Sequence, residues 1–256
     1  MGIEMKVMTF NLRIRTRSDG ENIFDLRQPH ILDVIKGEEP DVIGFQEAND
    51  DMIAFLQKNL PEYYFLGYGR NADYHGEAPA IAYRWEKFFV YSFAQEMLSL
   101  TPQVAGTRVD GINQSVCPRA FACAELICKE NNARFSVYNV HTDHIDQQTV
   151  FAECVMLMQS IGRRGGSFIL TGDFNATPDM PAIEMIRASK DALGTVDLTA
   201  NIKTSFHGYG KMKEDYKIDY IFTNMAADPN LSYAVSQPEV GYYSDHHALC
   251  AKISVE

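Results

Sequence analysis

Short apolar runs of strand length alternate with longer segments of helical period along the chain, and this alternation constrains the fold more than any other feature. Strands are predicted over residues 6–12, 41–47, 63–68, 79–84, 88–93, 120–128, 134–140, 167–171, 217–223, 231–235 and 248–253. Helices are predicted over 25–36, 52–60, 148–161 and 181–189. This mixture indicates sheets packed together and covered by helices. Because no Pro/Gly/Ser-rich linker or repeat divides the sequence, we expect one domain over residues 1–256.

Composition excludes several classes of protein. The chain has 23 Lys and Arg against 34 Asp and Glu, a net charge of −11, so it does not coat duplex DNA through a bulk positive field. An odd count of five cysteines without a Cys-x-x-Cys motif argues against a disulfide framework or a zinc ribbon and favours a cytoplasmic protein. No apolar stretch approaches the roughly 20 residues that a bilayer requires, so no transmembrane segment is expected. The oligomeric state is left open, with a monomer as the expected form.

Polar side chains recur where the predicted strands end. Asn11, Glu47, His141, Asp173 and Asn175 come at or after the ends of strands, Asp219 lies inside the strand 217–223, and Asp245 and His246 come just before the last strand. These eight are called the strand-end residues below. Residues at the ends of several strands can meet around one pocket, where two carboxylates raise each other's pKa unless a cation lies between them. The oxygen-rich members of this set suit a hard cation such as Mg²⁺ better than zinc. The histidines can exchange protons near neutral pH.

Six blocks around these residues resemble, in the same order, the endonuclease/exonuclease/phosphatase superfamily. The blocks are Met8-Thr9-Phe10-Asn11, Gly44-Phe45-Gln46-Glu47, Asn139-Val140-His141-Thr142-Asp143-His144, Thr171-Gly172-Asp173-Phe174-Asn175-Ala176, Lys217-Ile218-Asp219-Tyr220-Ile221-Phe222 and Tyr243-Ser244-Asp245-His246-His247. Gly69-Arg70, Gly76-Glu77, Thr101-Pro102 and Pro118-Arg119-Ala120 further resemble its bacterial branch related to deadenylases. The Trp usual before Thr-Pro and the Arg usual after Asp143-His144 are missing, which bears on the substrate rather than on the chemistry.

The resemblance implies an α/β fold: a four-layer α-β-β-α sandwich of two packed mixed β-sheets flanked by helices, with the site at one end. It also implies Mg²⁺- or Mn²⁺-dependent hydrolysis of a phosphate ester. Glu47 is expected to hold the metal ion, with Asn11 and Asp245 beside it. A divalent ion neutralises the charge that phosphodiester hydrolysis spreads over the phosphate oxygens, and it would let an acidic pocket accept an anionic substrate.

The same resemblance implies catalytic roles. Asp173 is expected to orient or deprotonate the attacking water, and Asn175 to hold a phosphate oxygen. His246 is expected to contact the scissile phosphate and to pair with Asp219, while His141 stabilises the phosphorane from the other side. Amide and imidazole donors of this kind typically contribute about 10²–10³ in rate each.

Two further residues are assigned to substrate binding. Glu77 is expected to be the partner of His141, and Arg119 to clamp the phosphate. Arg70 is expected to be a surface charge. His207 has no motif support and is also expected at the surface.

The leading functional hypothesis is a metal-dependent phosphodiesterase, and its substrate has two candidates. The deadenylase-like blocks favour single-stranded nucleic acid cut by a 3′ exonuclease, whereas the acidic net charge and the lack of a basic run favour a small phosphoester. Taken together, these features slightly favour a general phosphodiesterase. The alternative from another class is a non-catalytic phosphoester-binding module of the same fold. It predicts at least one lost catalytic position, and none of the eight strand-end residues is lost.

Overall fold

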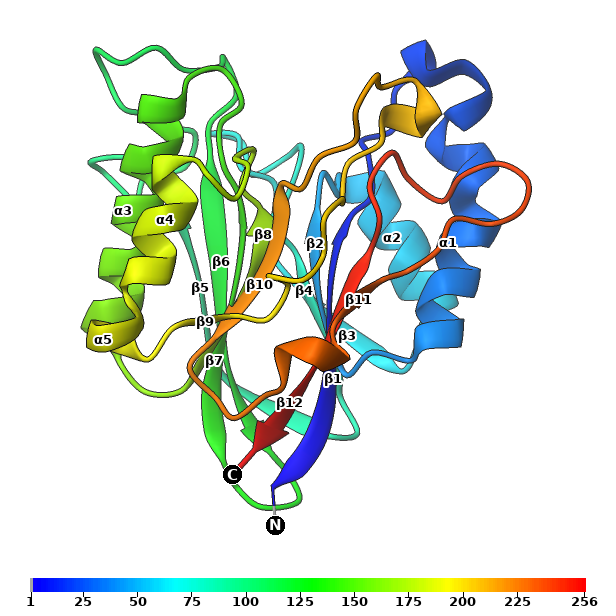
Figure 1. Cartoon of the computed structure of the whole chain (residues 1–256). Helices are drawn as coiled ribbons and strands as arrows, with labels where there is room; N and C mark the ends of the chain where they lie inside the picture. The colour runs from blue at the N-terminus through cyan, green and yellow to red at the C-terminus, as the bar shows by residue number, and fades with distance from the viewer. Residues whose placement is uncertain (1) are drawn as a thin grey trace.

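The computed structural model describes residues 2–256 and shows two six-stranded sheets packed face to face (Figure 1). The first sheet has the order β11 (Tyr233–Ala234), β12 (Leu249–Val255), β1 (Ile3–Asn11), β2 (Val42–Gln46), β4 (Ile81–Arg84), β3 (Tyr63–Leu66). The second has the order β5 (Phe88–Met97), β6 (Ala120–Cys128), β7 (Arg134–His141), β8 (Phe168–Asp173), β10 (Asp219–Thr223), β9 (Val196–Asp197). Both sheets are mixed, because β1 pairs with β2 and β7 with β8 in parallel, among antiparallel neighbours.

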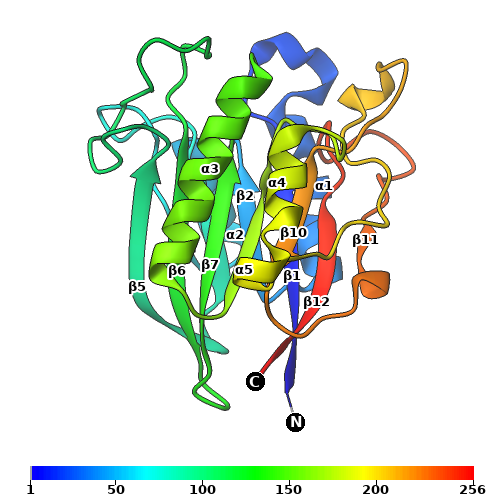
Figure 2. The same ribbon diagram turned by 60° about the vertical axis from the view of Figure 1, so that its left-hand side comes forward.

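Helices cover the outer faces of both sheets, which confirms the predicted four-layer sandwich (Figures 1 and 2). The first sheet carries α1 (Phe24–Glu38) and α2 (Asp50–Asn59), and the second carries α3 (Gln147–Arg164), α4 (Pro181–Ala188) and the short α5 (Lys190–Leu193). Three 3₁₀ turns complete the chain: η1 (Arg17–Asn22), η2 (Gly208–Gly210) and η3 (Pro229–Leu231). Within residues 2–256, no helix combines the length and the apolar character needed to cross a bilayer.

Three apolar clusters hold the layers together. Val137 belongs to the cluster between the sheets, Ile35 and Leu56 to the cluster beneath α1 and α2, and Leu157 and Leu170 to the cluster beneath α3 and α4. These side chains are completely buried. Burying apolar surface in this way is the main term that favours folding, so the layers follow directly from the apolar periodicity of the sequence.

Several predicted strands differ in extent from the structure, and for two of them the local cause is clear. The prediction over 231–235 is wrong in extent, because Asp228 accepts a hydrogen bond from the Asn230 amide (2.9 Å) and caps the turn η3, which leaves only Tyr233–Ala234 as β11. The strand predicted over 217–223 begins at Asp219 rather than at Lys217. The buried Lys217 ammonium donates instead to the Thr199 carbonyl (2.6 Å).

Strand register aligns the polar strand-end residues. His141 lies opposite Asp173 in the parallel pair β7–β8, and Asp173 lies opposite Asp219 in the antiparallel pair β8–β10. In the first sheet, Asn11 at the end of β1 lies opposite Gln46 at the end of β2. The carboxyl ends of these four parallel-paired strands meet at the end of the sandwich opposite both chain termini (Figure 1).

A buried polar network locks the two sheets together below this end. The Asn139 amide donates to the carbonyls of Phe45 (2.7 Å) and Ala80 (2.9 Å), and its oxygen accepts from Gln46 Nε2 (2.6 Å). Gly44 permits the close approach, since a Cβ there would lie 2.0 Å from the Thr171 hydroxyl. Hydrogen bonds between polar groups in a dry interior favour one arrangement of the layers, and this arrangement positions the strand ends above it.

Candidate active site

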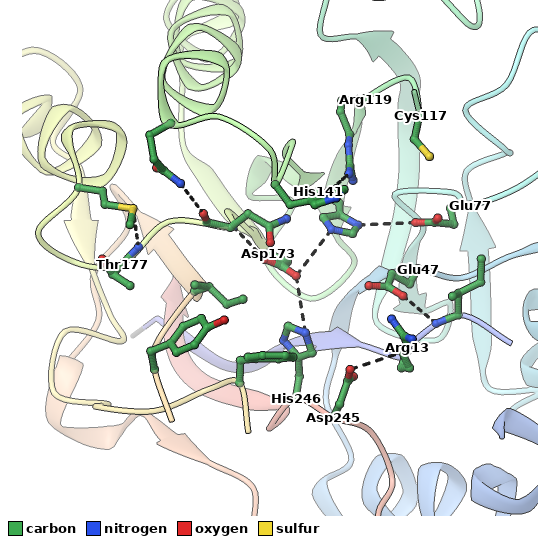
Figure 3. Close-up of a pocket in the computed structure, with 18 of the residues that line it drawn as sticks. Arg13, Glu47, Glu77, Cys117, Arg119, His141, Asp173, Thr177, Asp245 and His246 are labelled. Carbon is green, nitrogen blue, oxygen red and sulfur yellow. Dashed lines mark hydrogen bonds and ion pairs between the residues drawn. The ribbon is translucent and has the colours of Figure 1, made fainter. Parts of the chain in front are cut away.

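A cavity of about 780 Å³ opens where the strand ends meet (Figure 3). Both sheets contribute to its wall. The first sheet and the loops after its strands supply Arg13, Glu47, Glu77 and Asp245, and the second sheet supplies His141, Asp173 and Asn175. The structure therefore brings the sequence-predicted residues to one place. Asn11 and Asp219 lie directly behind the lining residues, where both are buried.

Asp173 stands at the centre of the cavity wall (Figure 3). Its Oδ2 accepts a hydrogen bond from Asn11 Nδ2 (2.9 Å) and lies 3.7 Å from His141 Nε2 and 3.8 Å from His246 Nε2. Its Oδ1 accepts from the Asn175 backbone amide (2.9 Å). Burial and the neighbouring Asp219 carboxylate raise the pKa of Asp173 to about 7. A carboxylate with such a pKa can take a proton at neutral pH.

His246 is held by a buried carboxylate. Its Nδ1 lies 2.8 Å from Asp219 Oδ2, and the same oxygen accepts a hydrogen bond from the Ser205 hydroxyl (2.6 Å). The Phe206 ring packs on the imidazole with 4.8 Å between ring centroids. Although burial alone lowers the pKa of His246, the carboxylates of Asp219, Asp245 and Asp173 outweigh it and raise this pKa to about 10. The imidazole is therefore charged at neutral pH.

His141 faces the same Asp173 oxygen from the other side, in the opposite charge state. Burial, together with the nearby Arg119 and Arg70 guanidinium groups, lowers the pKa of His141 well below its ordinary value. Its Nδ1 lies 3.7 Å from Glu77 Oε2, and Glu77 Oε1 pairs with Arg70 Nη2 (2.9 Å). One aspartate thus lies between a neutral and a charged imidazole. Such a separation of pKa values is typical of acid–base sites.

Glu47 and Asp245 form the acidic end of the cavity. Glu47 accepts hydrogen bonds from Asn11 Nδ2 (3.3 Å) and the Ile14 amide (2.8 Å). Burial and the Glu47 charge raise the pKa of Asp245. A carboxylate whose ionisation is disfavoured beside a second carboxylate fits a divalent cation, because a hard cation takes oxygen ligands and removes the repulsion. Asn11 Oδ1 accepts from the Arg13 amide (2.9 Å), so its Nδ2 is the group that faces the carboxylates.

Arg119 and Arg70 form a cationic wall of the cavity beside His141 and Glu77. Arg119 is 4% exposed, its Nη2 donates to His144 Nδ1 (2.8 Å), and its Nε and Nη1 have no hydrogen-bond partner within residues 2–256. Arg70 is 5% exposed, so its prediction as a surface charge is wrong. The ion pair with Glu77 explains why this charge is buried, since paired charges are the ones that interiors tolerate.

His207 is also buried, which contradicts its prediction as a surface residue. Burial and the nearby His247 lower the pKa of His207 to about 4. The backbone amides of His207 and Gly208 both donate to the Asp245 carbonyl (3.0 and 3.1 Å). This segment therefore supports the loop that carries Asp245 and His246.

Two arginines near the acidic end were missed by the sequence reasoning. Arg13 lines the cavity two residues after Asn11. Arg27 is 1% exposed and donates to the carbonyls of Leu12 (2.7 Å), Arg13 (2.8 Å), Asn22 (2.6 Å) and Tyr243 (2.6 Å). Its signal was present in the sequence, because Arg27 has the helical spacing of the apolar Ile31 and Ile35. A charged side chain on the buried face of a helix needs hydrogen-bond or ion-pair partners.

Comparison with known proteins finds relatives along nearly the whole chain. An uncharacterised protein of Acanthamoeba polyphaga mimivirus is 28% identical over 237 residues, which cover 85% of this chain and 87% of the viral protein. The endonuclease/exonuclease/phosphatase of Bacteroides vulgatus superposes with a TM-score of 0.90 at 25% identity, covering 99% of this chain and 100% of that one. A mannosyl-6-phosphatase of Bacteroides thetaiotaomicron superposes with a TM-score of 0.83 at 22% identity, covering 98% and 100%.

The family model described as the endonuclease/exonuclease/phosphatase family matches residues 8–246, from the first predicted strand to His246. This span contains all eight strand-end residues that converge on the cavity. Members of this family hydrolyse phosphoesters, as nucleases or as phosphatases. The fold, the six ordered blocks and the family match agree, and the chain belongs to the endonuclease/exonuclease/phosphatase family.

Proposed function

We propose that this protein is a metal-dependent phosphoesterase that uses Mg²⁺ or Mn²⁺. The observation that carries the proposal is the arrangement around Asp173: a carboxylate with a pKa of about 7 stands between the neutral His141 and the charged His246, beside the acidic pair Glu47 and Asp245. A base, a fixed cation and a place for a divalent ion are the parts that phosphoryl-transfer chemistry requires.

Glu47 and Asp245 are the residues that we propose hold the metal ion, with Asn11 bracing Glu47 through its amide. Asp173, Asp219 and His246 also place one ligand atom each within 4.8 Å of one another. However, His246 Nδ1 bonds to Asp219, and the raised pKa keeps this imidazole protonated, whereas metal ions bind neutral imidazole. When bound, the metal ion neutralises charge on the phosphate oxygens and polarises the P–O bond.

The chain's own residues divide the remaining work. Asp173 orients the attacking water in line with the scissile bond and takes its proton. His246 donates from its charged imidazole to a phosphate oxygen, and Asp219 holds that ring in place. Asn175 and His141 contact the phosphate from the β7–β8 side of the cavity. Because these groups are held by the fold, they stabilise the transition state without reorganising.

A small phosphoester fits this cavity better than an extended polymer. Three arginines and the charged His246 line the cavity, but Arg70 and Arg13 are already paired with Glu77 and Asp19. The chain also carries no basic run that could follow a nucleic-acid backbone. The sequence favours a phosphodiester. Arg119 supports a second candidate, a phosphomonoester. Its Nε and Nη1 have no hydrogen-bond partner within residues 2–256, although Nε lies 3.6 Å from Asp143 Oδ2. The terminal phosphate of a monoester carries one more charge and one more free oxygen than a diester does.

The test compares bis-p-nitrophenyl phosphate with p-nitrophenyl phosphate at fixed Mn²⁺, with and without EDTA. We expect EDTA to abolish turnover, and Glu47→Gln to lower kcat by at least roughly 10²-fold, as expected when a metal ligand is lost. Glu130→Gln removes an exposed carboxylate far from the cavity and is expected to leave kcat unchanged. Full turnover in EDTA, or in Glu47→Gln, contradicts the proposal.

Arg119→Gln separates the two ester classes. If the cationic wall binds a terminal phosphate, the variant loses more kcat/KM for the monoester than for the diester, by about tenfold or more for a charge-assisted contact. An equal loss for both esters would assign Arg119 a role common to all phosphoesters, as the sequence alone suggested.

A further inference from the structure

Five exposed aliphatic side chains lie at the end of the sandwich where the cavity opens, and the proposed chemistry uses none of them. Four belong to the loop 98–119 between β5 and β6, and the fifth to the loop after β7; they are Leu100, Val104, Ile112, Val116 and Ile145. Leu100 and Val116 are 81% and 87% exposed. A single exposed apolar side chain is ordinary, but a group of them beside a cavity is typical of an interaction surface. We call these five side chains the apolar rim.

Strand register brings the loop 98–119 to the cavity end. Phe121 at the start of β6 lies opposite Val140 near the end of β7, so the loop leaves the sheet where the cavity opens, and it projects from that end (Figures 1 and 2). Its second half lies against the loop after β7, because the Ser115 amide donates to Asp143 Oδ2 (2.9 Å). The two loops that carry the apolar rim are therefore in contact.

The apolar rim adjoins the cationic wall directly. Val116 precedes Cys117, and Ile145 follows His144; both Cys117 and His144 line the cavity. His144 accepts a hydrogen bond from Arg119 through Nδ1 (2.8 Å). A molecule that covers these two aliphatic side chains thus lies next to the guanidinium that the proposed function assigns to phosphate.

The loop 98–119 turns polar groups inward while its aliphatic groups face outward. The hydroxyls of Ser99 and Thr107 lie 2.7 Å apart, and Arg108 Nη1 donates to the Ser115 carbonyl (2.7 Å). Polar groups paired inside the loop lose no hydrogen bonds to water when its outer surface is covered. The loop is therefore built to leave water with its aliphatic side first.

The apolar rim is also neutral within a strongly acidic chain. Over residues 98–118 the formal charges are those of Arg108 and Asp110, which cancel, whereas the whole chain carries −11. The acidic remainder disfavours an anionic surface, but the rim can approach an uncharged one without stripping water from an unbalanced charge.

A lipid surface fits the apolar rim better than a protein surface does. Stable protein interfaces take roughly 20–30 residues a side and are anchored by Trp, Tyr and Arg. The rim instead has five side chains, all of them Leu, Val or Ile. At a lipid surface each apolar side chain contributes by the area that it removes from water, and no shaped partner is needed.

We propose that the apolar rim docks on a lipid surface without net charge, and that the cavity then receives the phosphoester head group of a lipid in that surface. The docking part is independent of catalysis, whereas the head-group part rests on the proposed phosphoesterase function. Docking places the head group beside Arg119, whose partner His144 is next to Ile145 in the chain.

The test of docking is sedimentation with vesicles of dioleoyl phosphatidylcholine. We expect the wild type to bind equally at low and high salt, because apolar burial involves no charge that salt could screen. Leu100→Asp and Val116→Asp should each lower the partition coefficient by about tenfold or more, as expected when a buried apolar side chain is lost. Both side chains are exposed, so the fold does not depend on them. The matched control is Leu231→Asp, which changes an exposed leucine of η3 beside β12, away from the cavity, and should bind like the wild type (Figure 1).

The test of the head-group part compares hydrolysis of vesicle lipid with hydrolysis of the soluble nitrophenyl esters at fixed Mn²⁺. The vesicles are phosphatidylcholine, a diester, with and without phosphatidic acid, a monoester. Val116→Asp should slow hydrolysis of the vesicle lipid by about tenfold or more and leave turnover of the soluble esters unchanged, because the substitution affects access to the surface and not the cavity.

Three results overturn docking: no sedimentation of the wild type with vesicles, unchanged binding of both Leu100→Asp and Val116→Asp, or a dimer that these substitutions dissociate, which would assign the apolar rim to a second copy of the chain. Turnover of the soluble esters without hydrolysis of either vesicle lipid overturns the head-group part. A failure of the proposed function looks different, since the wild type would then bind vesicles but hydrolyse neither nitrophenyl ester.

Discussion

At the scale of single residues, the chemistry of the cavity depends on two imidazoles that face one aspartate in opposite charge states. His246 is charged because Asp219 is 2.8 Å away, whereas Glu77 lies 3.7 Å from His141, which Arg119 and Arg70 also face. A short bond to a carboxylate in a buried site outweighs desolvation, but a longer approach beside two cations does not. The difference between the two histidines is therefore one of distance and neighbours.

Asp219→Asn should make His246 behave like His141. Without the Asp219 charge, burial dominates and the pKa of His246 falls from about 10 toward or below neutrality. We expect kcat at pH 8 to fall by roughly 10²–10³-fold and to recover partly as the pH is lowered, because the imidazole regains its proton there. The pH dependence of kcat, with an NMR titration of His246, measures this.

Ser205→Ala is the control for this variant. It removes the hydroxyl that donates to Asp219 Oδ2 and accepts from the Ile218 and Asp219 amides, but it leaves the Asp219 charge. It should retain the wild-type pH profile. If Asp219→Asn also retains that profile, the charge on His246 is not what Asp219 supplies.

The sequence identified the chemistry-bearing residues better than it identified their surroundings. Asp173, His246 and Glu47 were found because each lies in a short ordered block at a strand end. Arg70 and His207 were misplaced, because an isolated charged or polar residue most often lies at the surface. Whether it is buried depends on partners that are distant in the chain or follow it in a loop, such as Glu77 for Arg70.

At the scale of secondary-structure elements, helix α3 supports the segment between β7 and the cavity through Glu153. This carboxylate is 2% exposed and accepts a hydrogen bond from the Asp143 amide (2.7 Å), while Asp143 Oδ2 lies 3.6 Å from Arg119 Nε. Burial raises the pKa of Glu153 to about 8. Helix α3 thus carries a protonated carboxylic acid, Glu153, beneath the loop after β7, and this loop contacts Arg119 through Asp143.

Glu153 should make stability fall as the pH rises. The native chain keeps a proton on Glu153 up to about pH 8, whereas the unfolded chain releases it near pH 4.5, so the free energy of unfolding decreases across that window. The loss is of the order of 4 kcal/mol. Glu153→Gln stays neutral and should flatten the dependence, as urea unfolding at pH 5 and pH 8 would show.

An exposed carboxylate provides the comparison for this stability measurement. Glu130→Gln should follow the wild type at both pH values, because Glu130 is exposed in the turn after β6. Parallel curves for the wild type and Glu153→Gln would contradict the account of Glu153.

At the scale of the whole molecule, two sheets converge so that a strongly acidic chain presents a locally cationic wall. The net charge is −11, yet Arg70 and Arg119 face the cavity. Two arginines can hold one phosphate but cannot follow a polymer backbone, because nucleic-acid affinity grows with the number of neutralised phosphates. The charge distribution therefore favours a compact anionic substrate.

The salt dependence of oligonucleotide binding tests whether the cavity binds a compact anion or a nucleic acid. For a single-stranded oligonucleotide, the slope of log K against log salt is about −0.7 for each neutralised phosphate, so we expect a slope no steeper than about −1.4 for two arginines. Inorganic phosphate should compete fully for the same site. A slope of about −3 or steeper would indicate four or more phosphate contacts and would favour the single-stranded nucleic-acid substrate.

The layered fold and the identity of the residues at the strand ends could be predicted from the order of the amino acids alone. Apolar periodicity is a local property, so it predicted most strands and helices, and the ordered blocks placed a polar residue at one end of each key strand. Its errors, such as the short β11, lie where capping and turn geometry decide the outcome.

The electrostatics of the cavity could not be predicted in this way, because they arise from the packing of the two sheets. The separate charge states of His141 and His246, the burial of Arg70 and Arg119, and the position of Arg13 between Glu47 and Asp245 all depend on distances between distant segments. Charges act on each other according to separation and to the water excluded between them. The distances between these charges and the exclusion of water between them are fixed only when the two sheets pack together.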